Sequence, residues 1–120
     1  MKVTLKEIVD AREALITLSN QRLPIKQGYN VSKLIRKANA ELEVLTNVRQ
    51  DVINRLAPQG TEMNPEINQQ IVDELNVALE ASVEIPVNKI DLSSINNLEM
   101  TARDIMVLDP FCIFESVILE

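Results

Sequence analysis

The chain has 120 residues, of which 46% are apolar and 25% charged, and its net charge is −6 at pH 7. It contains no His and no Trp, and Cys112 is its single cysteine. Metal sites built on clustered His and Cys, disulfides within the chain and His-dependent catalysis are therefore excluded. We expect no enzyme activity, no catalytic or metal-binding residues and no cofactor, in one ordered domain spanning 1–120.

The sequence also bears on the compartment. It has no run of about 18–20 apolar residues, the length that spans a bilayer. The first residues, Met1–Glu7, lack the apolar core and the cleavage site of a signal peptide. We therefore expect a cytoplasmic protein that has no membrane partner.

The charges divide the chain into two unlike halves. Residues 1–57 carry ten basic and six acidic side chains, whereas residues 58–120 carry two basic and twelve acidic ones. This asymmetry indicates contact between the halves, within one chain or between copies. The alternative is two solvated faces that never meet. Nucleic acid is not expected as a partner, because phosphate binding needs a concentrated basic surface and this chain is acidic.

Residues 1–57 predict an antiparallel helical hairpin. Thr4 and Glu7 fit a capping box, and the apolar residues after them follow helical spacing over about residues 5–21. Pro24 then interrupts the pattern, because the residue before a proline is pushed out of helical geometry. A second helix follows, from 25–31 to 57, and at 1.5 Å per residue it is roughly 40 Å long. It extends beyond the part that the first helix can cover.

This second helix carries an apolar stripe with heptad spacing. The part of this stripe that the first helix cannot cover needs another partner, either the third helix or a second copy of the protein. The sequence thus predicts a homo-oligomer, and its candidate interface residues are Val31, Ile35, Ala38, Leu42, Leu45 and Val52.

Residues 58–120 predict a third helix followed by a short β-hairpin. Asn64 and Pro65 fit the N-cap and the first turn of the helix. Apolar residues then alternate over residues 82–87, where Pro86 indicates an edge strand, and residues 90–92 form the returning strand. The expected fold class is therefore α+β, mainly α, with a long antiparallel helical hairpin.

The last part of the chain predicts a short helix and a docked apolar segment. Thr101 caps the helix, which stops before Pro110, and the tail over residues 111–120 forms a strand or a helix. Adaptable and aromatic side chains dominate interface energetics, so the candidate partner-binding residues are Met106, Pro110, Phe111 and Phe114. The alternative is that the tail folds back and closes the core. Cys112 is expected to be a buried structural thiol, since no His is present to activate it.

A basic cluster on the second helix supports an alternative function. Lys33, Arg36 and Lys37 are the candidate ligand-binding residues of an oligomer that sequesters a small anionic molecule. The glycine-rich loop that cradles phosphates is missing, because glycine occurs only at Gly28 and Gly60. A solvated or acid-paired helix face is the simpler interpretation.

Several short stretches occur in a characteristic order: Leu5–Ile8, Leu23–Lys26, Asp73–Asn76, Val83–Pro86 and Leu108–Phe111. Their order resembles a group of small, mostly uncharacterised helical-hairpin proteins of bacteriophages and prophages. This chain continues further past Phe111 than the typical pattern. The resemblance implies a phage setting, in which small acidic non-enzymes assemble virions or block host factors. We therefore expect a protein–protein interaction module in the host cytoplasm or the virion, acting as an assembly accessory or as an inhibitor of a host protein.

Overall fold

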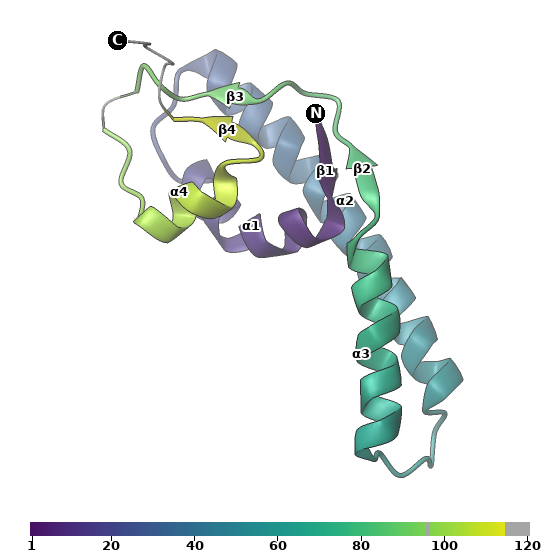
Figure 1. The fold of residues 1–120 in the computed structure, drawn as a ribbon. Coiled ribbons are helices and arrows are strands. Elements are labelled where there is room, and N and C mark those ends of the chain that lie inside the picture. The colour runs from purple at the N-terminus through teal and green to yellow at the C-terminus, as the bar shows by residue number, and fades with distance from the viewer. Residues whose placement is uncertain (96, 115–120) are drawn as a thin grey trace.

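The computed structural model describes residues 1–95 and 97–114. Within these residues the chain forms four helices and two two-stranded sheets (Figure 1). The expected fold class, α+β and mainly α, is confirmed, as is the packing of the first two helices as a hairpin. The molecule is elongated, measuring 58 × 28 × 23 Å, because one long helix extends well beyond the other elements.

The chain begins with β1 (Lys2–Thr4), which leads directly into α1 (Leu5–Ser19). The capping box expected at Thr4 is present. The Thr4 hydroxyl accepts from the backbone N–H of Glu7 at 3.1 Å, and the Glu7 carboxylate accepts from the backbone N–H of Thr4 at 2.9 Å. One face of α1 is buried, Ala11 and Ala14 included, and the helix packs against the long second helix.

Helix α2 (Ile25–Leu56) is continuous over 32 residues. Its first half packs against α1, whereas its second half passes beyond α1 and packs against α3 (Pro65–Leu79). Asn64 caps α3 as expected, because its side-chain oxygen accepts from the backbone N–H of Ile67 at 2.8 Å. The second half of α2 and α3 project as one unit in Figure 1. We call this unit, residues 43–79, the arm, and the remainder the body.

The hydrophobic core lies in the body. It is formed by α1, the first half of α2, the segment from 82 to 92 and the region around Phe111. The arm has a much thinner core. Among residues 43–79, all of which the structure describes, Val52 and Ile71 are the only buried side chains, at 8% and 7% exposure.

The strands pair differently from the expected β-hairpin. β2 (Ser82–Glu84) is antiparallel to β1, whereas β3 (Ile90–Asp91) is parallel to β4 (Cys112–Ile113). The chain does not reverse at 88–89 but continues across the body from β2 to β3 (Figure 1). The predicted hairpin is thus not formed. The physical reason is that the whole segment covers one core, so its apolar residues are all buried: Val83, Ile85, Val87, Ile90 and Leu92.

The segment before β4 contains α4 (Ala102–Leu108), which packs on α1. Its capping box is the expected one, with the Thr101 hydroxyl accepting from the backbone N–H of Asp104 at 3.1 Å. The helix also ends before Pro110, as expected. The beginning of the predicted tail forms β4, while residues 115–120 lie outside the described residues.

We predict that Phe111→Ala lowers the free energy of unfolding by about 3–5 kcal/mol, because Phe111 is 0% exposed and truncation leaves a cavity. Urea denaturation followed by circular dichroism measures the effect. Met106→Ala is the matched control, since Met106 is 70% exposed and its truncation changes stability by at most about 0.5 kcal/mol. Equal effects of the two substitutions would contradict this assignment of the core.

Candidate functional site

The candidate partner-binding residues do not gather on one exposed patch. Met106 and Pro110 line a hollow of about 200 Å³ beside Glu7 and Asp10. Phe111, in contrast, is fully buried in the core, and Phe114 packs half-buried against it. Phe111 is therefore not available to a partner. For Phe111 the alternative expectation holds, namely that this part of the chain folds back and closes the core.

The candidate oligomer-interface residues are largely covered within one chain. Val31 and Ala38 are 2% exposed in the core of the body, and Val52 lies in the arm, where α2 packs against α3. Ile35 and Leu42 are partly buried against the same core, and Leu45 is half-buried. The heptad stripe of α2 is thus covered mainly by α1 and α3 rather than left for a second copy. Heptad spacing is the same whether the covering helix belongs to the same chain or to another.

The basic cluster on α2 is divided by the structure. Lys37 Nζ forms an ion pair with Glu41 one turn later, at 3.1 Å. Lys33 Nζ lies 5.2 Å from the ring centroid of Tyr29, a cation–π distance. Among the three cluster residues, only Lys33 lines a groove, whereas Arg36 is exposed on the helix surface.

This groove lies between the beginning of α2 and the segment from 84 to 91, and its volume is about 660 Å³. Three lysines from two separate parts of the chain line it: Lys26, Lys33 and Lys89. We call it the lysine groove. Sequence reasoning missed Lys89, because only the path of the segment between β2 and β3 brings it opposite α2.

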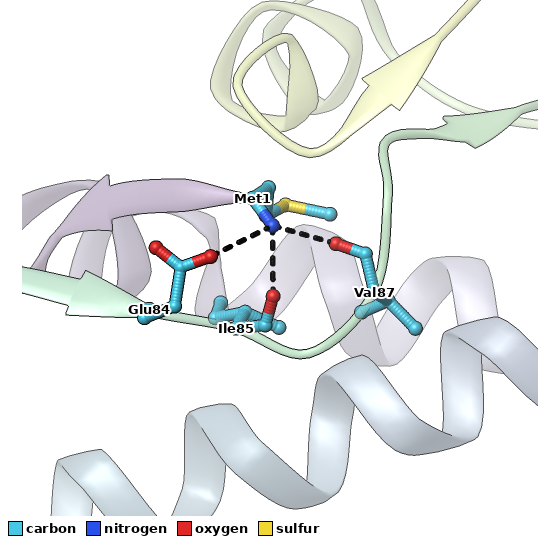
Figure 2. Close-up of polar contacts among 4 residues, drawn as sticks. All are labelled: Met1, Glu84, Ile85 and Val87. Atoms are coloured by element: carbon cyan, nitrogen blue, oxygen red, sulfur yellow. Dashed lines mark hydrogen bonds and ion pairs between the residues drawn. The ribbon is translucent and has the colours of Figure 1, made fainter.

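One wall of the lysine groove is fixed by the backbone at Met1 (Figure 2). The Met1 amino nitrogen donates to the carbonyl oxygens of Ile85 and Val87, at 2.7 and 2.8 Å, and lies 3.7 Å from the Glu84 carboxylate. These contacts hold the carbonyls on both sides of Pro86, and so they position the chain that faces α2.

Two carboxylates also line the groove, Glu84 and Asp91. The Asp91 carboxylate accepts hydrogen bonds from the hydroxyl and the backbone N–H of Ser93, at 2.5 and 2.9 Å, and these bonds lower the pKa of Asp91. Asp91 therefore stays ionised at neutral pH. The lining of the groove therefore includes three cationic and two anionic side chains.

The arm carries a second candidate surface. Its exposed apolar side chains are Val44, Val48, Met63, Val72 and Val77, with exposures from 37% to 71%. These residues come from both helices and from the loop between them. A partner that covers them removes apolar area from water, at a gain of about 25 cal/mol per Å².

Cys112 is 2% exposed in the core, as expected for a structural thiol. Burial raises the pKa of Cys112 to about 12, an effect that the positive charge of Lys89 partly opposes. Below that pH the folded protein therefore holds the thiol, which is neither the nucleophile nor a metal ligand.

We predict that the stability of the protein falls as the pH rises from 9 towards 12, in part because of Cys112. The thiol ionises near pH 9 in the unfolded chain but only near 12 in the folded one, so alkali favours the unfolded state. In this window the native protein should lose up to about 1.4 kcal/mol per pH unit more than the Cys112→Ala variant. Urea unfolding at several pH values measures both slopes, and parallel slopes would contradict the prediction.

Comparison of the chain with protein-family models, with curated proteins and with solved structures found no match. In the part of the chain that the structure describes, no helix combines the length and the apolar character needed to cross a membrane. Nor do the described residues contain a group of three His, Cys, Asp or Glu side chains that could hold a metal ion.

Proposed function

We propose that this protein is a non-enzymatic protein–protein interaction module that self-associates through its arm. The observation that carries the proposal is the incomplete cover of the arm, where one side chain of α2 and one of α3 are buried while five apolar side chains are exposed. Helices in proteins are stabilised chiefly by packing of their apolar faces. Two helices cover only part of each other, and a second pair completes the familiar four-helix arrangement.

We place this module in a phage, on the basis of the short stretches that resemble the phage and prophage group. The role there is that of a virion or assembly accessory, or of an inhibitor of a host protein. The projecting arm suits both roles, because it presents apolar surface away from the body. Mass spectrometry separates them: an accessory is present in purified particles, whereas an inhibitor is found bound to one host protein.

We predict that the purified protein forms an oligomer whose mass is a small multiple of 13.5 kDa. Light scattering coupled to size-exclusion chromatography, run over a dilution series, measures the mass at each concentration. Dissociation on dilution is expected, because association that buries apolar surface obeys mass action. A monomer at about 100 μM, a concentration at which even micromolar complexes are formed, would contradict self-association.

The lysine groove supports a second candidate function, binding of a small anionic ligand. The specific observation is that Lys26, Lys33 and Lys89 converge on one groove from two parts of the chain. Ammonium groups bind phosphates as point charges, and the groove of about 660 Å³ is large enough for a small ligand. These cations overlap only in part with the cluster expected from the sequence: Lys33 belongs to both and Lys26 is its neighbour on the same helix, whereas Lys89 was not expected and Arg36 and Lys37 do not line the groove.

We predict that inorganic pyrophosphate binds the lysine groove, as measured by isothermal titration calorimetry at low salt. Combined Lys33→Gln and Lys89→Gln substitutions should weaken binding about 100-fold or more, because each lost charged hydrogen bond is worth about 1.5–3 kcal/mol and about 1.4 kcal/mol is tenfold in affinity. Arg36→Gln is the matched control on the same helix and should leave binding unchanged. Absence of binding to the native protein, or equal loss in the control, would contradict this function.

A further inference from the structure

Apolar residues of the arm lie on both of its long edges. Along one edge, Arg55 of α2 forms an ion pair with Glu74 of α3. Successive helical residues are turned by about 100°, so the exposed Val44 and Val48 of α2 fall on this edge near Arg55, while a second set of apolar residues from both helices falls towards the opposite edge. We call this the apolar edge; it consists of Leu45, Ile53 and Leu56 of α2 and Val72, Leu75 and Leu79 of α3. Val72 is 41% exposed and the other five are half-buried, so the edge is only partly covered.

At the base of the arm, the apolar edge continues into a groove between α1 and α2. Leu45 and Arg49 line a hollow of about 520 Å³, which shares Arg12 and Leu42 with a neighbouring hollow of about 200 Å³. The two hollows therefore form one groove, which we call the interhelix groove. Its walls are partly apolar and include the exposed side chains Val9 and Ile16.

The charges at the two ends of the apolar edge are opposite. Arg12 and Arg49 line the interhelix groove at the base, where Glu43 is the one carboxylate among the lining residues. Glu62 and Glu66 lie at the tip, and residues 58–88 contain no basic side chain. A second arm laid antiparallel along the edge brings its acidic tip to the basic base. A parallel arm brings carboxylates to carboxylates.

The size of the surface sets a requirement on any such arrangement. Each helix is about 10 Å wide, and 15 residues of helix are about 22 Å long, so the two helices of the arm present roughly 440 Å². A stable interface buries about 800 Å² of each partner. The arm alone is therefore smaller than a stable interface, so an interface here requires the interhelix groove to contribute the remainder.

We propose that the partner of this surface is a second copy of the chain. Two copies pack their apolar edges together antiparallel about a twofold axis, and the acidic tip of each arm lies in the interhelix groove of the other. The two arms then form a four-helix bundle with an isologous interface. This inference rests on the proposed self-association and specifies its surface, its orientation and the number of copies.

Two valines of α3 provide a matched test. Val72 belongs to the apolar edge, whereas helical spacing places Val77, which is 71% exposed, towards the edge marked by Arg55 and Glu74. Val72→Glu should raise the dissociation constant of the dimer about 30-fold or more, the effect of losing a central interface residue. Val77→Glu should change it at most about threefold. Light scattering over a dilution series measures both constants, and circular dichroism checks the fold of each variant.

The possible outcomes separate this inference from the function on which it rests. A native dimer that is unaffected by Val72→Glu, or that is weakened more by Val77→Glu, overturns the apolar edge while self-association stands. A native protein that is monomeric overturns both. An oligomer larger than a dimer overturns the closed twofold arrangement.

Charge reversal tests the orientation without altering the apolar residues. Combined Arg12→Glu and Arg49→Glu substitutions make both ends of the edge acidic, and combined Glu62→Arg and Glu66→Arg substitutions make both ends basic. In the antiparallel dimer each variant alone should dissociate at least tenfold more readily than the native protein, and an equal mixture should form a heterodimer of native affinity. Native mass spectrometry detects the heterodimer. Undiminished homodimers of both variants would overturn the antiparallel orientation.

Discussion

The continuous length of α2 is the constraint on which the rest of the structure depends. Its 32 residues span about 48 Å, whereas α1 and α3 have 15 residues each and can cover only about 22 Å. α1 therefore covers the first half of α2 and α3 covers the second. The two halves of α2 are buried to different extents because they contact different numbers of other elements. The first half also contacts the segment between β2 and β3 and shares its core, but the second half has α3 alone. The arm is consequently the less covered part of the molecule.

The extended segment from 82 to 92 completes the body because it finds backbone partners at both ends of the described chain. β2 pairs with β1, and the backbone N–H groups of Ile90 and Leu92 donate to the carbonyls of Phe111 and Ile113. Each sheet is only two strands wide, and such a pair is marginal by itself. Both are stable here because their inward side chains belong to one core with α1 and α2. The same path brings Lys89 opposite Lys33, so the lysine groove is a consequence of how the core is closed.

What the sequence could predict follows the range of the interactions involved. The caps at Thr4, Asn64 and Thr101 each depend on atoms within three residues, and all three are present. The helical hairpin was also predictable, since apolar spacing and Pro24 are local signals. The pairing of Ile90 with Cys112 was not, because alternation predicts a strand and says nothing about its partner. The burial of Phe111 was not predictable for the same reason. A phenylalanine looks the same in the sequence whether it fills the core or contacts a partner.

The candidate surfaces were harder to predict for a related reason. The stripe of α2 and its basic cluster were both visible in the sequence, but the structure redistributes their members. Lys37 is paired with Glu41, and Arg36 is exposed and is not among the residues that line the groove with Lys33. Leu45 is the one candidate interface residue that also belongs to the apolar edge, and the edge as a whole was recognisable only once α3 was placed against α2. The sequence of one helix is enough to predict which residues share a face of that helix. A surface formed by two helices can be predicted only when the rotation of each helix relative to the other is known.

The charge asymmetry of the chain connects these surfaces to association. Among the described residues, the ion pair between Arg55 and Glu74 is the one in which a basic side chain of residues 1–57 meets an acidic side chain of residues 58–120. The two halves are held together mainly by apolar contacts, so most of their charge is not matched within one chain. In the antiparallel dimer that we propose, a second copy would match it, because the acidic tip of each arm would meet the basic groove of the other. In the proposed dimer, charge therefore acts on the orientation in which the two chains meet.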